Sequence, residues 1–414
     1  MAKASLLILA HAFPPENTSG AARPYRFYKY LPDYGYECRV VAGGSERLEE
    51  PDTICRVPAC TRQLHAVSAA GKACQIIQRY LLPYNEQLGF VPHAIAAGGR
   101  MLTGGDVVLS TSPPLATHMA ALQLKKRHRL VWVADFRDPL FGNPFRNRKG
   151  ARLYDASLER WLFGNADALL ANTDVAARLW RERYPQWAEK IHVVWNGFDP
   201  AESFEPAPIP TRPYKVLAHV GALYGGRHPT LLVDCVERLI RAGRLAPACL
   251  KLDFVGPMEP GAADSLRRLE KLGCVDFTPH RVSRSQALHK IATSDFLLLL
   301  DVNASNAGYQ VPAKIFDYLR TGRPVLALTA RNSPVDRILA DSGIRHVSID
   351  PQDNIETIDE KMLSFLNLDA TPVRTSDWFA TNFDGRRQAG TVAAILDGLR
   401  SRSGPLLRTK CPER

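Results

Sequence analysis

The stretch VPAKIFDYLRTGRPVLAL, residues 311–328, predicts a short helix that leads directly into a buried strand. Pro312 suits the first helical position, Gly322 suits the residue just past the helix end, and Pro324 prevents the helix from continuing. The apolar run from Val325 to Leu328 is typical of a strand. The stretch therefore predicts one helix–strand unit of an α/β fold.

Two charged residues of this stretch suggest a binding site. Lys314 and Asp317 lie three residues apart, so they share one face of the predicted helix, near its N-terminus. Unpaired backbone N–H groups give that terminus a partial positive charge, which favours an anion. A cation for phosphate and a carboxylate for hydroxyl groups together predict a site for a nucleotide sugar.

The helix–strand alternation extends along nearly the whole chain, on both sides of a proline-rich stretch at residues 200–214. The strand-like runs are SLLILA, CRVVAG, DVVLS, LVWVA, ALLAN and HVVWNG, followed by KVLAHVG, KLDFVG, FLLLLD, PVLAL and RHVSI. Such alternation predicts parallel sheets covered by helices, here an α/β fold with two Rossmann-like domains facing a cleft. The predicted divisions are a first domain at 1–200, a linker at 201–214, a second domain at 215–375, a C-terminal helix at 376–400 and a basic tail at 401–414.

Composition narrows the class of protein. The 414 residues are 45% hydrophobic and 23% charged, an ordinary globular balance, and the length favours two domains. The net charge of +11 fits nucleic acid, an anionic membrane or a phosphorylated substrate. The eight cysteines show no CxxC and no metal-type spacing, which predicts reduced thiols in a cytoplasmic protein without a metal site. The N-terminal ASLLILAHA resembles a minimal signal peptide, but a first buried strand over residues 5–10 fits the alternation better.

The loop after the second domain's first strand, GALYGGRHP, carries candidates for phosphate binding. Gly221, Gly225 and Gly226 would let the backbone approach a ligand closely. Arg227 stands just before a predicted helix, where its guanidinium can hold a diphosphate through two hydrogen bonds. Neither G-x-G-x-x-G nor a P-loop motif occurs, which disfavours a standard NAD site and a P-loop NTPase.

The first domain carries a second group of candidates, in segments that follow its predicted strands. The residues predicted to bind the acceptor or to line the cleft are Gly20, Arg23, His118, Asp135, Arg137 and Asp138. Charges gathered at a strand end need a ligand or an ion-pair partner. A structural Asp–Arg pair and a structural histidine are therefore the alternatives.

Five segments along the chain carry a resemblance to a known family: FPPE…SGAAR, ADFRDP, VVWNGFDP, HVGALYGGR and VPAKIFDYLRTGRPVLA. In their order and spacing they resemble the family 4 glycosyltransferases, which have the GT-B fold. The resemblance extends from about residue 5 to about residue 395. The resemblance implies transfer of a sugar from a nucleotide sugar, usually with retention of configuration and without a metal. It implies that Arg227 and Lys314 neutralise the departing diphosphate and that Asp317 binds the ribose hydroxyls. It also implies that the C-terminal helix crosses back to the first domain.

The chain departs from the family pattern at one position. Many members carry two glutamates with seven residues between them around this helix. Here Asp317 stands at the second position, and the first falls on Tyr309. Asn306, Gly308 or Gln310 would then meet the hydroxyls of the donor sugar.

Clusters of basic residues indicate which partners the protein could bind, and they leave alternative functions open. Three basic segments are expected to contact anionic lipid: KKRHR at residues 125–129, RNRKGAR at 146–152 and the tail. Such a contact suits a glycan or lipid-linked acceptor and peripheral attachment at the inner membrane face. KKRHR contains no aromatic residue, so nucleic acid is not the expected partner. The alternatives are a GT-B nucleotide-sugar epimerase that uses His118 and Asp135 as acid and base, a catalytically silent relative, and a nucleic-acid-binding protein.

Overall fold

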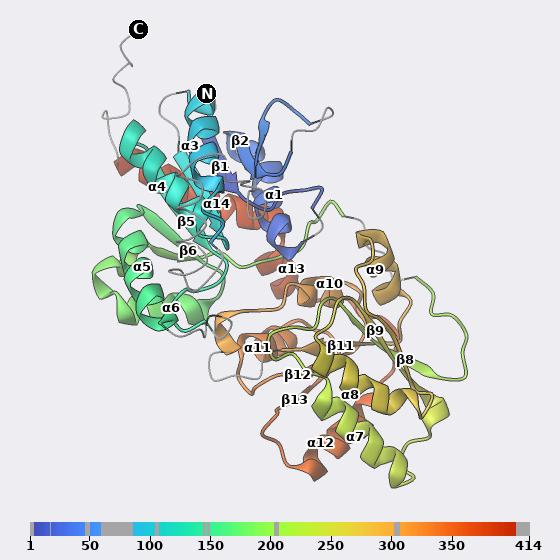
Figure 1. Cartoon of the computed structure of the whole chain (residues 1–414). Helices are drawn as coiled ribbons and strands as arrows, with labels where there is room; N and C mark the ends of the chain where they lie inside the picture. Colours follow the sequence, from blue (N-terminus) through green and yellow to red (C-terminus); the bar gives the residue numbers. More distant parts are fainter. Residues whose placement is uncertain are drawn as a thin grey trace, which may run out of the picture. The chain divides into compact units, whose positions relative to one another are not determined.

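The computed structural model describes residues 4–16, 18–45, 50–58, 86–103, 107–143, 146, 150–202, 207–301 and 307–402. Contacts divide the chain into two units (Figure 1). Unit 1 comprises the chain up to Asp199 together with the segment from Gly385 onward, and unit 2 comprises Pro200–Asp384. In the described part of the chain, each unit contains a parallel sheet with apolar side chains packed against it, so the α/β prediction of two Rossmann-like domains is confirmed.

Unit 1 is built on a seven-stranded parallel sheet in the order β3-β2-β1-β4-β5-β6-β7. Its strands are β1 Ala4–Ala10, β2 Tyr36–Gly43, β3 Ile54–Val57, β4 Val107–Ser112, β5 Val131–Phe136, β6 Ala168–Ala171 and β7 Ile191–Val193. Every strand except β3 coincides with an apolar run that the sequence predicts. The edge strand β3 is half-buried at its first two residues and has no continuous apolar run, so the sequence pattern does not reveal it.

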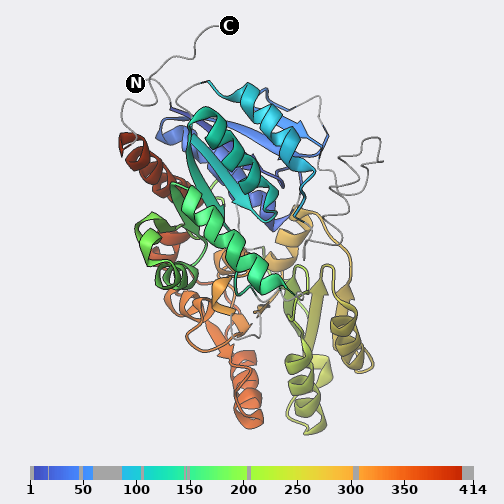
Figure 2. The ribbon, with the colours of Figure 1, turned by 60° about the vertical axis from the view of Figure 1, so that its left-hand side comes forward.

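The helices of unit 1 cover both faces of this sheet. They are α1 Ser19–Tyr30, η1 Leu31–Tyr34, α3 Phe90–Met101, α4 Ala116–His128, α5 Ala151–Asn165, α6 Asp174–Arg183, η3 Pro185–Lys190 and α14 Gly385–Arg402. Helix α14 lies beside α1, although the two are at opposite ends of the chain (Figures 1 and 2). Phe27 of α1 and Leu396 of α14 share one core with strand residues such as Ile8. The Tyr36 hydroxyl also donates a hydrogen bond to Asp397 at 2.6 Å.

Unit 2 has a six-stranded parallel sheet in the order β10-β9-β8-β11-β12-β13. Its strands are β8 Lys215–Val220, β9 Leu250–Val255, β10 Val275–Thr278, β11 Phe296–Leu300, β12 Val325–Leu328 and β13 His346–Ile349. Its helices are α7 Thr230–Arg241, η4 Pro247–Cys249, α8 Pro260–Glu270, α9 Arg284–Ala292, η5 Ala307–Tyr309, α10 Lys314–Arg320, α11 Pro334–Asp341, α12 Ile355–Leu366 and α13 Asp377–Phe383. The strand order reverses between β8 and β11. Ligands of open α/β sheets bind beyond the carboxyl ends of the strands at such a point.

The stretch at 311–328 forms helix α10 and strand β12, as predicted, but the helix begins later than expected. Pro312 lies two residues before the first helical residue, Lys314, and its carbonyl accepts a hydrogen bond from the Ile315 N–H at 3.0 Å. Gly322 follows the helix with φ of +72°, a conformation that glycine adopts without strain. Tyr318 fixes α10 to the end of β8, since its hydroxyl accepts the Val220 N–H at 2.8 Å.

None of the helices in the described part of the chain combines the length and the apolar character that a membrane span requires.

Candidate functional site

Two cations, the half-buried Lys314 and the buried Arg227, occupy the region where β8 ends. The Lys314 Nζ, on the first residue of α10, lies 2.7 Å from Nε2 of His219 on β8. Arg227, in the loop after β8, is 7% exposed, and its guanidinium carbon lies 5.1 Å from the centre of the Tyr224 ring. Burial, and next the charge of Arg227, lower the pKa of Lys314 to about 7. The two predicted phosphate-binding cations therefore interact electrostatically at one place.

Lys314 has no carboxylate partner within ion-pair distance among the residues that the structure describes. An ammonium group that is half-buried without a counter-ion is unfavourable, because it is partly removed from water and no opposite charge compensates it. The site is therefore suited to an anion. A phosphate group would supply the missing negative charge.

Glycines make this arrangement sterically possible. Gly221 has φ of +132°, and a Cβ atom there would lie 2.7 Å from the Lys314 Nζ. Gly256 also has φ of +132°, and its Cβ would lie 2.7 Å from the backbone of Gly221. Gly225 and Gly226 have φ of +61° and +85°, and the Gly225 N–H donates to Glu259 at 3.1 Å. Gly221 thus makes room for the lysine, while the other two predicted glycines turn the loop that carries Arg227.

Replacing Gly221 by alanine is expected to displace the Lys314 side chain and lower donor affinity by about tenfold or more, the loss of one charge-assisted contact. The measurement is calorimetric titration with a nucleotide sugar. Gly243→Ala is the matched control, because Gly243 also has positive φ, +67°, but a Cβ there meets nothing within 4 Å. Equal losses in the two variants would attribute the effect to backbone strain and contradict the steric role of Gly221.

Asp317 lies on the same helix but contacts a different partner. Both its carboxylate oxygens accept hydrogen bonds from the Arg284 guanidinium, at 2.6 and 2.7 Å. Arg284, the first residue of α9, also donates to the carboxylate of Glu202 at 3.1 and 2.8 Å. The Asp317 side chain remains 18% exposed, so its outer lone pairs are still open to a ligand. Arg284 is a neighbour of the site that the sequence analysis missed, because 33 residues separate it from Asp317.

The segment before α10 carries the position where the family pattern expects an acidic residue. Tyr309 is 8% exposed at the end of η5, and Gln310 is 9% exposed. Gly308 lies in η5 and is half-buried. Asn306 lies outside the described residues.

In unit 1, Arg23 and Asp135 bind each other in the interior. The Arg23 Nε and Nη2 both donate to the Asp135 carboxylate, at 2.8–3.1 Å, and the two residues are 1% and 0% exposed. The Thr111 hydroxyl donates to the same carboxylate at 2.8 Å. Arg23 also donates to the Trp195 carbonyl at 2.8 Å. This pair joins α1 to the ends of β4, β5 and β7, which corresponds to the structural Asp–Arg alternative.

Arg137 holds the neighbouring loops through backbone carbonyls. Its guanidinium donates to Ser112 at 3.0 Å and also to Gly20 and Pro113. A Cβ atom on Gly20 would lie 2.6 Å from Nη1 of Arg137, so glycine permits this contact. Burial lowers the pKa of Arg137, and the charge of the half-buried Asp138 opposes this by raising it.

His118 belongs to the core of unit 1. It is 0% exposed, its Nδ1 lies 2.7 Å from Ser110 Oγ, and its ring lies 4.3 Å from the ring of Phe136. Burial lowers its pKa to about 3, against a raising effect of Asp135. The imidazole is therefore neutral at physiological pH and has no contact with solvent.

No cluster of three or more His, Cys, Asp or Glu side chains suited to a metal ion occurs within the described ranges of the chain.

Comparisons with known proteins agree with this fold. Residues 22–202 match the family model Glycosyltransferase Family 4, which confirms the resemblance over that segment. No curated protein sequence matches the chain. Similar solved structures include the N-terminal domain of trehalose-6-phosphate phosphatase from Candida albicans (TM-score 0.62, 11% identity, covering 95% of this chain and 97% of that one). HepE of Anabaena, in complex with UDP and glucose, has a TM-score of 0.59 at 14% identity over 95% and 100% of the two chains.

A further similar structure is WaaG, a glycosyltransferase involved in lipopolysaccharide biosynthesis (TM-score 0.59, 15% identity, covering 98% of this chain and 100% of that one). At these identities the likeness shows the fold, which is GT-B. The family match and the fold together support a nucleotide-sugar glycosyltransferase.

Proposed function

We propose that this chain is a retaining, hexosyltransferase-type glycosyltransferase, which moves a sugar from a nucleotide-sugar donor to a glycan or a lipid-linked saccharide. The observation that carries the proposal is the pair of cations at the carboxyl end of β8, the buried Arg227 and the half-buried Lys314. The family match over residues 22–202 supports the same reaction class.

The proposed chemistry uses these cations at the leaving group. As the bond between the anomeric carbon and the diphosphate oxygen breaks, the electron pair moves to that oxygen. Fixed positive charges of Arg227 and Lys314 stabilise the developing negative charge and lower the barrier. The acceptor hydroxyl oxygen forms the new bond to the anomeric carbon, and its proton passes to an oxygen of the departing diphosphate. Because two cations serve this purpose, we propose that no metal cofactor takes part and expect transfer to persist in EDTA.

Asp317 is proposed to bind the ribose hydroxyls of the donor. Each carboxylate oxygen already accepts a hydrogen bond from Arg284 and can accept another. Arg284 thus holds the carboxylate in one orientation before the donor arrives. Gly221, Gly225, Gly226 and Gly308 are proposed to line the donor site through their backbones.

The first unit provides no support for the epimerase alternative. That alternative requires His118 and Asp135 to exchange protons with a substrate. His118 is closed to solvent with its pKa lowered by burial, and Asp135 is bound by Arg23 and Thr111. We propose instead that Gly20, Arg23, His118, Asp135, Arg137 and Asp138 shape the acceptor-side loops of unit 1.

The test is incubation of the pure protein with UDP-, GDP-, ADP- and dTDP-sugars, with and without lipid extract, while release of the nucleoside diphosphate is measured. Release with one nucleotide is the expected result, and Arg227→Ala should remove most of it. Absence of turnover with every donor would favour a catalytically silent relative. Full activity of the Arg227→Ala variant would refute the proposed leaving-group site.

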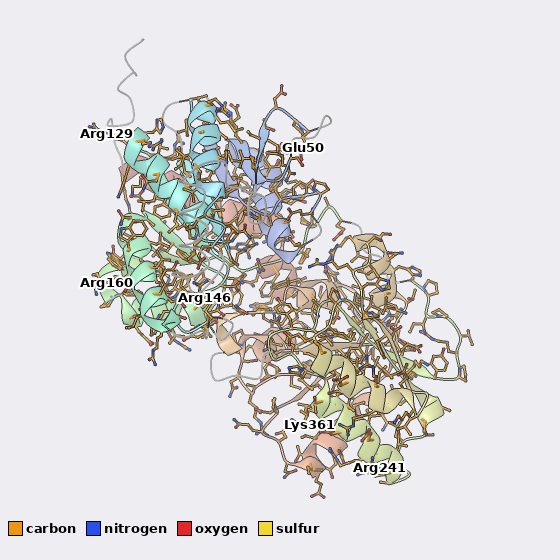
Figure 3. All side chains as sticks on the ribbon, viewed as in Figure 1. Glu50, Arg129, Arg146, Arg160, Arg241 and Lys361 are labelled. Atoms are coloured by element: carbon orange, nitrogen blue, oxygen red, sulfur yellow. The ribbon has the colours of Figure 1, made fainter. Side chains whose placement is uncertain are left out.

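We further propose that unit 1 contacts an anionic membrane, in keeping with a lipid-linked acceptor and a place at the cytoplasmic side of the inner membrane. Leu153 and Trp161, on α5, are 79% and 42% exposed. The Lys126 ammonium of α4 lies 6.0 Å from the Trp161 ring centre. Arg129 and Arg160 lie on the same side of this unit (Figure 3) and are exposed. Apolar side chains surrounded by cations are typical of a surface that enters a lipid headgroup layer.

Replacing Leu153 and Trp161 together by serine is expected to weaken sedimentation with phosphatidylglycerol vesicles by about tenfold or more, because both apolar contacts are lost. Phosphatidylcholine vesicles should bind neither protein. Exposed Ile355 in unit 2 offers the control, and Ile355→Ser should bind like the wild type. Equal binding of all three proteins to the anionic vesicles would rule out this surface.

A further inference from the structure

His219 is a buried polar residue at the proposed donor site to which the proposed chemistry assigns no role. It lies on β8, is 0% exposed and packs against the Phe254 ring at 5.7 Å between ring centres. The backbone of Gly221 acts on its ring and raises its pKa, and the two ring nitrogens face two further groups. Nδ1 lies 3.0 Å from the Leu298 carbonyl oxygen of β11, and Nε2 lies 2.7 Å from the Lys314 Nζ.

The Leu298 carbonyl determines which nitrogen of His219 carries the proton. A carbonyl oxygen can only accept a hydrogen bond, so Nδ1 must donate to it. In the neutral imidazole, Nε2 then has a free lone pair. Burial, and next the charge of Lys314, hold the pKa of His219 well below its usual range, so the ring stays neutral. The lone pair on Nε2 therefore faces Lys314 as an acceptor.

This acceptor orients the lysine. Lys314 lies against the bare backbone of Gly221, and one of its three ammonium N–H groups points to Nε2 of His219. Two N–H groups remain for an anion. A flexible lysine side chain would otherwise lose more rotamer freedom when a ligand binds.

We propose that His219 is a positioning residue, which accepts one N–H of Lys314 and so directs the other two at the diphosphate of the donor. This inference rests on the proposed function and adds to it the residue that prepares the cation. His219 itself touches no substrate and transfers no proton in this role.

A pH dependence of donor binding follows. The groups that face Lys314 are His219 on β8 and Arg227 in the loop after β8. The nearby titratable residues of α10 have other partners: Tyr318 is hydrogen-bonded to the Val220 backbone, and Asp317 to Arg284. With its pKa lowered to about 7, Lys314 is charged below that pH and loses its proton above it. A bound diphosphate favours the ammonium form and raises this pKa. Donor affinity is therefore expected to fall above about pH 7, by up to about tenfold per pH unit, with uptake of a proton on binding.

The variants His219→Leu and His219→Gln test the role. Leucine removes the acceptor, so affinity for the nucleotide sugar identified by the donor experiment should fall by about 10- to 100-fold, the effect of a hydrogen bond to a charged group. The fall with pH should also begin at a lower pH, because the ammonium form has lost a stabilising contact. Glutamine offers a carbonyl oxygen near the position of Nε2 and should restore most of the affinity.

The matched control is His346→Leu in the same unit. His346 also lies on a strand, and its Nδ1 lies 2.9 Å from a backbone carbonyl, that of Ile344, but it is not bonded to Lys314. Its replacement should leave affinity and its pH dependence unchanged. Affinity and proton uptake are measured by calorimetry at pH 6–9 in buffers of different ionisation enthalpy.

A double variant separates positioning from folding. If His219 acts through Lys314, adding His219→Leu to Lys314→Met should cause no further loss of affinity beyond about twofold. Additive losses, or a His219→Leu protein with wild-type affinity and pH profile, would overturn the inference. Failure of the wild type to bind any nucleotide sugar would instead overturn the proposed function, so the two failures are distinguishable.

Discussion

Replacing Lys314 by methionine is expected to lower the rate of sugar transfer by about 10²- to 10³-fold, the effect of removing one fixed charge that stabilises a leaving group. Unit 2 should nevertheless remain folded. Methionine fills a similar volume, and its thioether requires no counter-ion in the half-buried space beside Gly221. The rate is measured as nucleoside diphosphate released at a saturating donor concentration.

The same variant should be as stable as the wild type at high pH and more stable near neutral pH, by about 1 kcal/mol or more. The Lys314 pKa is about 7 in the folded protein and near its ordinary value of 10.5 in the unfolded chain. Between these values the unfolded chain binds more protons, so the wild type gains stability from Lys314 as pH rises. Methionine removes this dependence. The check is hydrogen exchange of β8 and β11 in urea at pH 7 and pH 10.

Lys361→Met provides the contrast. Lys361, on α12 (Figure 3), donates to Asp353 at 2.6 Å, and the Asp353 side chain is 1% exposed. Loss of this partner should destabilise unit 2 without changing the rate of transfer. A Lys314→Met protein that behaves in the same way, less stable and fully active, would make Lys314 a structural residue.

The strands in the interior of both sheets could be predicted because they are continuous apolar runs. PVLAL and FLLLLD became β12 and β11, each buried along its whole length. The edge strands β3 and β10 were not predicted. ICRV has two half-buried residues followed by two buried ones, and VDFT has one buried residue followed by exposed and half-buried ones. Four positions of this kind form neither a continuous apolar run nor a clear period. An edge strand also contacts its sheet on one side only, so fewer of its residues must be apolar.

The site was predictable where one segment carries the chemistry. Lys314 could be found from its helix, and Arg227 from its glycine loop. The partners that determine what each group can do lie far away in the sequence: His219 is 95 residues from Lys314, and Arg284 is 33 from Asp317. His219 reads as one residue of an apolar strand, with no local signal. The order of strands in the sheet brings β8 beside β11, and only then do the Leu298 carbonyl and Lys314 meet its two nitrogens.

Replacing Asp135 by alanine is expected to destabilise unit 1 by about 3–5 kcal/mol, because Arg23 would remain buried without a counter-ion. Thr111 would also lose its acceptor. Unfolding in urea, followed by tryptophan fluorescence, reports mainly on this unit, which contains Trp132, Trp161, Trp180, Trp187 and Trp195. Glu37→Ala is the matched control in the same unit, since the Glu37 side chain is 50% exposed and its pair with Arg39 at 2.8 Å should contribute at most about 1 kcal/mol.

Removing both charges, as Arg23→Met with Asp135→Leu, should recover most of the lost stability, since two apolar side chains replace the pair. This double variant also decides between the two roles considered for the residues. If the pair only joins α1 to the ends of β4 and β5, the refolded double variant transfers sugar at a rate near that of the wild type. A stable double variant whose KM for the acceptor rises at least about tenfold, while its donor affinity is unchanged, would show that Arg23 or Asp135 binds the acceptor. Burial of both side chains, at 1% and 0% exposure, favours the first result.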